Sequence, residues 1–279
     1  MFHVEIMTPK DFEFAIKITE PMGWGLAQSD FQFMIKLEPE GCFTLFDDFE
    51  RIGVATTVSY GEVGWFGNLI IRPDKREKGG GSLLVRHALE YLAKKDVKTV
   101  GLYSYIDKIP FYTKLGFKRE SEFMVLKGKA FASPTSTSLK KATKSDARAI
   151  ISLDQDCFGG HRRKLLELIL SDPDNIGYTF FENNRLLGFV TAKVYDSSAD
   201  LGPLECEQGQ TNIAMSLLKV TLNELKSREV SVCIPKKETA IISLLKEHGF
   251  NEAFSVARML KGSVVSKDCI YLAESLERG

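Results

Sequence analysis

The chain alternates between short apolar runs and longer segments whose apolar residues recur every three or four positions. In the first half, the short runs typical of strands are residues 40–48, 51–61, 68–73, 99–106 and 123–128. Two segments with helical periodicity interrupt them, residues 81–96 and 109–117. One long and one short helical segment thus separate the later strands of this half. This order of elements predicts a domain of the α/β class.

The second half repeats this order of elements. Its strand-like runs are residues 176–183, 185–195, 199–206, 229–235 and 255–262, and its helical segments are residues 211–228 and 239–250. Gly116-Phe117 recurs as Gly249-Phe250, 133 residues later, and Leu126-Lys127-Gly128 recurs as Leu260-Lys261-Gly262, 134 residues later. A constant offset between matching elements favours an internal duplication.

A polar segment separates the two halves. Residues 131–147, FASPTSTSLKKATKSDA, are rich in Ser, Thr and Pro and contain few large apolar side chains. Such a composition is typical of a linker. The sequence therefore predicts an N-terminal domain over residues 1–130, a linker over 131–138 and a C-terminal domain over 139–279.

Composition and charge narrow the class of protein. The 279 residues include 37 basic and 37 acidic side chains, so the net charge is zero. Nucleic acids and anionic membranes favour basic partners, and no apolar run approaches the roughly 20 residues of a membrane span. The five cysteines are widely spaced without a CxxC pair, and no histidine stands at ligand spacing. We expect no metal, no nucleic-acid or membrane partner, and a reducing cytoplasm.

A glycine-rich basic segment connects a strand to the first long helix. Residues 72–84 read RPDKREKGGGSLL. Glycines permit close approach of a ligand to the backbone, and the unpaired N–H groups at a helix N-terminus attract anions. The spacing fits neither the P-loop pattern nor the GxGxxG fingerprint. The segment therefore predicts a pyrophosphate-binding loop, with a solvated flexible loop as the alternative.

Two motifs about 30 residues apart resemble those of one family. Residues 76–81 fit the pattern Arg/Gln-x-x-Gly-x-Gly/Ala, and Ile71-x-Pro73 precedes them. Downstream, residues 109–117 read IPFYTKLGF. The combination resembles the acetyl-CoA loop and the Phe-Tyr-x-x-x-Gly-Phe segment of the GNAT (Gcn5-related) N-acetyltransferases, over residues 1–128. The resemblance implies two tandem GNAT-like domains in an α+β layered form, each a mixed, mostly antiparallel sheet flanked by helices.

The resemblance also implies a reaction and its residues. An acetyl group would pass from acetyl-CoA to a primary amine by direct attack in a ternary complex, and the acceptor would be a small-molecule or peptide amine. Tyr112 stands at the usual general-acid position. The residues implied in cofactor binding are Leu69, Ile70, Ile71, Arg76, Glu77, Lys78, Gly79, Gly80, Gly81 and Ser82.

The general base is not evident. A lysine-type amine has a pKa of about 10.4, so it must lose a proton before it can attack. The position where some members carry a glutamate falls near Trp65. Glu62 is a nearby candidate, with a water relay as the alternative, and His87 fits better as an ordinary helix residue. Trp24 is a candidate for the acceptor pocket or for the core.

The second half departs from the family pattern. Where the glycine loop is expected, residues 205–210 read ECEQGQ, and Leu245 stands in the place of Tyr112. This half is therefore expected to be a degenerate GNAT-like domain that covers a sheet edge or walls the acceptor site. Two other functions stay open for the whole chain: an acyltransferase for longer acyl-CoA, and a CoA-binding module without turnover. Oligomeric state is not predicted.

Overall fold

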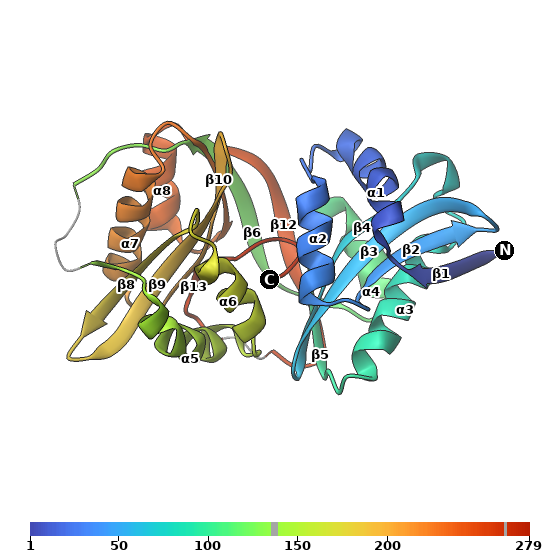
Figure 1. Cartoon of the computed structure of the whole chain (residues 1–279), viewed down its shortest axis with the longest axis horizontal. Coiled ribbons are helices and arrows are strands. Elements are labelled where there is room, and N and C mark those ends of the chain that lie inside the picture. Colours follow the sequence, from blue (N-terminus) through green and yellow to red (C-terminus); the bar gives the residue numbers. More distant parts are fainter. Residues whose placement is uncertain (135–138, 265–266) are drawn as a thin grey trace.

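A single mixed sheet runs through the whole molecule. The computed structural model describes residues 1–134, 139–264 and 267–279. Thirteen strands in these residues join one sheet, in the order β1-β2-β3-β4-β5-β12-β6-β11-β10-β9-β8-β7, with β13 paired to β10. Helices flank the sheet in two lobes, one for each half (Figure 1). The mixed α/β architecture with flanking helices confirms the predicted fold class.

The elements of the first half follow the predicted order. Its strands are β1 (Phe2–Ile6), β2 (Cys42–Asp47), β3 (Glu50–Tyr60), β4 (Val63–Ile71), β5 (Thr99–Tyr105) and β6 (Lys118–Lys129). Its helices are α1 (Phe12–Thr19), α2 (Gln28–Leu37), α3 (Gly80–Ala93) and α4 (Ile109–Lys114). The pattern did not predict β1, α1 or α2, and it placed the start of β4 five residues late.

The second half repeats the arrangement. Its strands are β7 (Lys140–Lys141), β8 (Ile176–Glu182), β9 (Arg185–Val194), β10 (Ser198–Cys206), β11 (Glu229–Pro235), β12 (Asn251–Lys261) and β13 (Ile270–Leu272). Its helices are α5 (Ala147–Phe158), α6 (Arg163–Ser171), α7 (Thr211–Glu224) and α8 (Thr239–Glu247). Among the described residues, no helix is long and apolar enough to cross a lipid bilayer.

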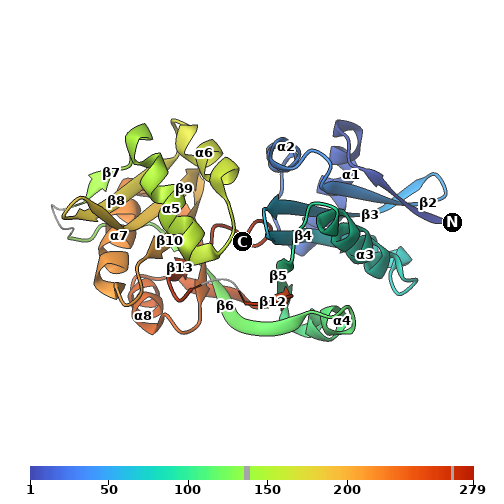
Figure 2. The same cartoon turned by 90° about the horizontal axis from the view of Figure 1, so that it is seen from below.

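The two halves exchange their last long strands. Residues 123–129 of β6 pair with residues 229–235 of β11, in the other half. Residues 256–261 of β12 pair in return with residues 100–105 of β5, and β6 and β12 pair with each other. Figure 2 shows β5, β12 and β6 passing between the lobes. The proposed boundaries at 1–130 and 139–279 therefore separate units whose sheets depend on each other, and linker residues 135–138 lie outside the described residues.

Apolar packing also joins the halves. On one face of the first sheet, Leu84, Ala88 and Leu92 of α3 are fully buried against β2, β3 and β4. On the other face, Phe31 and Met34 of α2 belong to a cluster that continues into α5 and α6 of the second half. One hydrophobic cluster thus continues from the first half into the second and holds the lobes together.

Each half contains a pair of parallel strands that diverge. β4 and β5 pair only through residues 63–65 and 99–101. In the second half, β10 and β11 pair only through residues 198–200 and 229–231. The opening in the first half is a cavity, whereas the opening in the second half is filled by β13, which pairs with β10 and whose continuation donates from Ala273 N to Cys233 O over 2.9 Å.

The segment after β13, residues 273–279, passes between the halves and contacts both. Trp65 Nε1 donates to the Leu276 carbonyl over 3.1 Å, and Arg162 Nη1 donates to the Gly279 carbonyl over 2.6 Å. A Cβ atom on Gly67 would lie only 2.6 Å from the Cα of Glu277. Glycine at that position of β4 is therefore what allows the segment to lie against the first half.

Candidate active site

The main cavity lies where β4 and β5 diverge and extends toward the second half. Its volume is about 1150 Å³. The predicted site residues Leu69, Ile70, Ile71, Arg76, Glu77, Gly79, Gly80, Gly81, Ser82 and Tyr112 all line it. Lys78 is the one predicted site residue that does not. A cavity of this size at a strand-to-helix junction is an appropriate place for a ligand.

The glycine loop has the backbone conformation that its sequence implies. Gly79 caps α3 with φ of 88°, and Glu77 has φ of 64°. Left-handed conformations at both positions turn the chain so that α3 begins at Gly80 with its N–H groups facing the cavity. A Cβ on Gly81 would meet Phe111 at 3.5 Å, an ordinary contact at the cavity wall. The free space beside Gly81 is thus available to a ligand.

The basic residues of the loop differ in their availability. Arg72 is paired with Asp74 and Glu50, each at 2.5 Å, and Lys75 is paired with Asp47 and Glu50. These pairs reduce the positive potential that the sequence alone implied. Arg76 Nε donates to the Ile71 carbonyl over 2.9 Å, which fixes the loop against the end of β4.

A β-bulge in β4 lies beside the cavity. The β3–β4 register shifts between Thr56, which pairs with Gly67, and Val54, which pairs with Ile70. Asn68, with φ of 51°, and Leu69 form the extra segment, and Asn68 Nδ2 donates to Thr56 Oγ1 over 3.2 Å. A bulge interrupts the ladder and redirects backbone groups. Backbone N–H groups at Leu69–Ile71 therefore lie at the cavity wall.

Tyr112 reaches the cavity from α4. Its ring packs edge-on against Phe111 and Phe117, with centroid distances of 5.0 and 5.9 Å. The residue is only 9% exposed, and burial raises the pKa of its phenol well above the ordinary value. The hydroxyl therefore stays protonated across the physiological pH range and can act as a donor.

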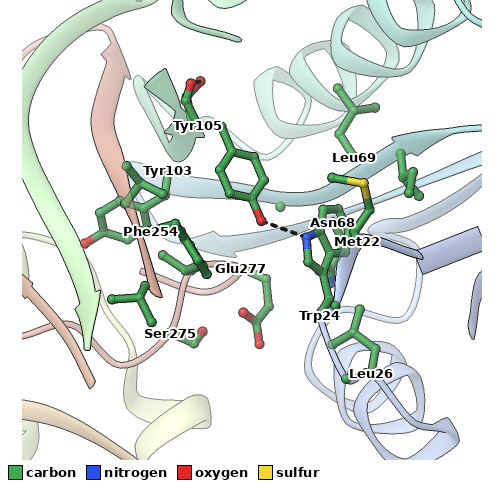
Figure 3. Close-up of a pocket in the computed structure, with 18 of the residues that line it drawn as sticks. Met22, Trp24, Leu26, Asn68, Leu69, Tyr103, Tyr105, Phe254, Ser275 and Glu277 are labelled. Carbon is green, nitrogen blue, oxygen red and sulfur yellow. Dashed lines mark hydrogen bonds between the residues drawn. The ribbon is translucent and has the colours of Figure 1, made fainter. Parts of the chain in front are cut away.

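The far end of the cavity is aromatic and is built by both halves. Trp24 follows α1, Tyr103 and Tyr105 come from β5, and Phe254 comes from β12 of the second half (Figure 3). Trp24 Nε1 donates to the Tyr105 hydroxyl over 2.9 Å, and the Tyr105 and Phe254 rings lie 5.2 Å apart. Trp24 thus lies at the pocket, in agreement with one of its two sequence interpretations.

The sequence candidates for a base lie elsewhere. Glu62 is exposed and paired with Lys98, and neither Glu62 nor His87 lines the cavity. His87 packs against Phe43, with ring centroids 4.8 Å apart, and burial lowers the pKa of its imidazole. Glu277, from the segment after β13, is one of the carboxylates that line the cavity on the aromatic side (Figure 3). Sequence reasoning missed it, because no motif connects a residue at position 277 with the first half.

The second half lacks the corresponding site. Its loop between β10 and α7 is only residues 207–210, and Leu245 is fully buried in α8. The assignment of Glu205 to this loop is wrong: it lies within β10, fully buried, with Oε1 2.6 Å from Arg162 Nη2. Arg162 also contacts Asp154, and burial raises the pKa of the Glu205 carboxyl. Glu207 is the acid that remains on the loop.

Other chemistry is limited in the part of the chain that the structure describes. No group of three or more His, Cys, Asp or Glu side chains there could hold a metal ion. All five cysteines are buried free thiols. The site therefore has to be interpreted through its glycine loop, its bulge, Tyr112 and the aromatic end.

Comparisons with known proteins identify the family. A model of the acetyltransferase (GNAT) family matches residues 12–117, and a model of the acetyltransferase (GNAT) domain matches residues 150–271. The chain is 25% identical over 265 residues to the holothin acyltransferase of Pseudoalteromonas sp. (strain SANK 73390), covering 92% of this chain and 87% of that protein.

Solved structures share the fold. A putative acetyltransferase from Pyrococcus horikoshii matches with a TM-score of 0.84 at 21% identity, covering 100% of this chain and 96% of that one. A GCN5-related N-acetyltransferase from Sphaerobacter thermophilus matches with a TM-score of 0.67 at 15% identity, covering 100% and 98%. A tandem GNAT protein from the clavulanic acid biosynthesis pathway matches with a TM-score of 0.65 at 12% identity, covering 95% and 100%. The chain belongs to the GNAT acyltransferase family and carries two GNAT domains in tandem.

Proposed function

We propose that the protein is an N-acetyltransferase that uses acetyl-CoA and a primary amine in a single active site in the first half. The observation that carries this proposal is one continuous cavity that joins the glycine loop, the β4 bulge and Tyr112. These are the parts needed to bind a pyrophosphate, to polarise a thioester carbonyl and to protonate a leaving thiolate.

The glycine loop is the proposed binding site of the CoA pyrophosphate. The N–H groups at the start of α3 and the space beside Gly81 fit an anion, and Arg76 and Ser82 line the same wall. Leu69, Ile70 and Ile71 border the opening between β4 and β5, where an extended chain could pair with the free strand edge. Lys78 lies outside the lining residues and is assigned a role in the surrounding positive potential only.

The proposed reaction balances within this site. The nitrogen lone pair of the neutral amine forms a bond to the thioester carbonyl carbon, while a backbone N–H beside the bulge stabilises the charge on the carbonyl oxygen. The carbonyl then re-forms as the carbon–sulfur bond breaks, and the attacking nitrogen releases one of its two protons to the solvent. The thiolate takes the proton of the Tyr112 hydroxyl, which the solvent restores.

The second half is proposed to have a structural role and to contribute to binding of the acceptor amine. β13 occupies the opening that would otherwise correspond to the cofactor cleft, and β12 supplies Phe254 to the pocket of the first half. The second domain therefore completes the active site without a cofactor of its own. The five free thiols support a reducing compartment, so we also propose that the protein acts in the cytoplasm.

Release of free CoA thiol tests the function. The protein is mixed with acetyl-CoA and a broad panel of primary amines, and the product is identified by mass spectrometry. Amine-dependent thiol release with a mass gain of one acetyl group is expected. Binding of CoA without thiol release for any amine would instead favour a binding module without turnover. Faster thiol release from a longer acyl-CoA would mean that the acyl donor is not acetyl-CoA.

A further inference from the structure

We infer that the aromatic end of the cavity and Glu277 form the acceptor site for a compact primary amine with an apolar or aromatic body and no carboxylate beside the amine. Glu277 binds the ammonium group and receives the proton that the amine must lose. This inference rests on the proposed function, because it assigns the acceptor of that same site. It also places part of the site on the last residues of the chain.

The walls of this end are aromatic and fixed by contacts. The Trp24–Tyr105 hydrogen bond of 2.9 Å joins the segment after α1 to the end of β5. Tyr103 packs between Trp65 and Phe123, with centroid distances of 5.2 and 5.0 Å. Aromatic faces attract cations and also bury apolar groups. Such a pocket therefore suits a molecule that carries a positive charge on a small apolar body.

Glu277 is positioned by its backbone. Its Cα lies against Gly67 of β4, one residue before the bulge of Asn68 and Leu69, and the residue lines the cavity beside this strand. Glu277 Oε1 accepts from Arg278 Nη1 at 2.6 Å, whereas Oε2 has no partner among the described residues. The side chain is 18% exposed, and Glu277 is among the residues that line the cavity (Figure 3).

The cation beside Glu277, Arg278, is already paired with carboxylates of the protein. Arg278 is 4% exposed and is also held by Glu274, which in turn is paired with Lys193 at 2.7 Å. Arg278 is therefore not available to a substrate carboxylate. The other titratable groups that line the cavity on this side come from both halves: Asp30, Tyr103, Tyr105, Lys108, Lys127, Tyr195, Asp200, Glu229 and Cys233.

These neighbours disfavour a substrate carboxylate. Burial raises the pKa of the Tyr103 and Tyr105 phenols, so both stay neutral. Two lysines line the cavity on this side: Lys108 is paired with Asp107, and Lys127 lies on β6 beside Ser231 of β11. A carboxylate beside the amine of the substrate would meet the aromatic faces and Glu277, whose neighbouring cation Arg278 is already paired. The site is therefore expected to discriminate amines from the corresponding amino acids.

The proton step follows from this geometry. An ammonium bound to Glu277 Oε2 transfers one proton to the carboxylate and becomes a neutral amine with a lone pair for attack. The carboxyl group then returns the proton to the solvent. After the attack the nitrogen still carries one proton more than the amide, and it releases that proton to the solvent. Glu277 thus acts on the nucleophile, while Tyr112 protonates the leaving thiolate.

Matched amines test the substrate class without any variant. 2-Phenylethylamine and phenylalanine share an aromatic body and a primary amine and differ in the carboxylate, whereas ethylamine lacks the aromatic body. We expect kcat/KM for 2-phenylethylamine to exceed that of both others by about tenfold or more, as expected for one lost or unbalanced interaction. Equal or faster turnover of phenylalanine would overturn the inference and leave the proposed function intact.

Glu277→Gln tests the carboxylate, with Glu62→Gln as the matched control outside the cavity. Glu277→Gln should lower kcat/KM for the amine by about tenfold or more at about pH 7, while acetyl-CoA affinity and the melting temperature stay close to those of the wild type. Glu62→Gln should behave as wild type.

The pH profile separates this role from a structural one. As the pH rises toward the amine pKa of about 10, more amine is already neutral and needs no proton acceptor. The deficit of Glu277→Gln should therefore shrink with rising pH. A deficit that is constant with pH, or full activity of Glu277→Gln, would contradict the inference. Absence of turnover with every amine would instead contradict the proposed function.

Discussion

Leu272 of β13 pairs with Leu204 of β10 in antiparallel register, inside the opening that separates β10 from β11. The equivalent opening of the first half is part of the main cavity. A strand of the same chain thus occupies the second potential cofactor site. Residues 207–210 contain a single glycine, and β13 fills the cleft; both features argue against a second cofactor site.

We therefore expect one CoA molecule per chain, bound in the first half. Native mass spectrometry at near-stoichiometric CoA should show a single mass increment. Two increments at that ratio would show that β13 can leave its position and would remove the structural argument for one site.

Gly81→Val is expected to weaken acetyl-CoA binding by about tenfold or more, which corresponds to about 1.4 kcal/mol. A Cβ at this position makes only ordinary contacts with Phe111 and Ile71, so the fold should tolerate the change. The added methyl groups would extend into the space assigned to the pyrophosphate. Calorimetric titration measures the affinity, and Ala93→Val, at the exposed end of the same helix, is the matched control. Unchanged affinity in Gly81→Val would remove the loop assignment.

Tyr112→Phe is expected to lower turnover by about 100-fold to 10,000-fold while acetyl-CoA affinity is retained. Burial raises the pKa of this phenol, so the hydroxyl is available as a donor at every pH where the enzyme is assayed. Removing it leaves the packing against Phe111 and Phe117 in place. Steady-state kinetics should be combined with a thermal melt.

Tyr91→Phe is the control for this experiment. Its hydroxyl donates to Glu38 over 2.5 Å, and the residue does not line the cavity. It should affect stability and spare turnover. Normal turnover in a stable Tyr112→Phe variant would end the assignment of Tyr112 as the acid.

The strand exchange predicts that the two proposed domains do not fold independently. Residues 1–130 alone would leave β6 without β11 and β5 without β12. We expect fragments 1–130 and 139–279 to aggregate when expressed separately and to copurify as a one-to-one complex when expressed together, because exposed sheet edges pair readily. Size-exclusion chromatography and circular dichroism provide the measurement. A soluble fragment 1–130 with a cooperative melt would contradict the prediction.

Glu274 predicts a specific dependence of stability on pH. Burial opposes its ionisation, but Arg278 and Lys193 outweigh this effect and hold the pKa of the carboxyl well below its ordinary value. A carboxyl with a lower pKa in the folded state stabilises the fold above its unfolded pKa of about 4.3 and loses that contribution as the pH falls. At about pH 7, Glu274→Gln should therefore lower the free energy of unfolding by about 3 to 5 kcal/mol.

The difference between wild type and Glu274→Gln should shrink as the pH falls below about 4.3. Glu205, whose pKa is raised chiefly by burial, contributes in the opposite direction in both proteins. The pKa of Asp154 is raised chiefly by burial and also by Glu274, so the substitution slightly reduces the opposing contribution of Asp154. Denaturant unfolding at several pH values measures the difference between the two proteins, with Glu167→Gln, in an exposed pair with Arg163, as control. A difference that does not change with pH would show that the carboxylate is not ionised in the fold.

Local patterns in the sequence were sufficient to predict the elements that carry the proposed chemistry. The glycine loop, the helix that follows it and the Phe111-Tyr112 segment lie within about 45 residues of one another, and their order, periodicity and capping are properties of neighbouring positions. The same holds for the duplication, since matching elements recur at nearly constant offset. The sequence by itself therefore determined the family, the tandem arrangement and one end of the site.

The tertiary structure decided which strands meet. β6 and β12 carry the same Leu-Lys-Gly motif near their ends and have similar apolar patterns, so each could complete the sheet of either half. The alternation of apolar and polar residues along a strand does not determine which strand it pairs with. The exchange and the approach of Glu277 to Gly67 join residues 100 or more positions apart, and β13 enters the second cleft by pairing with residues 65 to 68 positions away. Such contacts depend on the total packing of both halves, because no local propensity distinguishes one long-range strand partner from another.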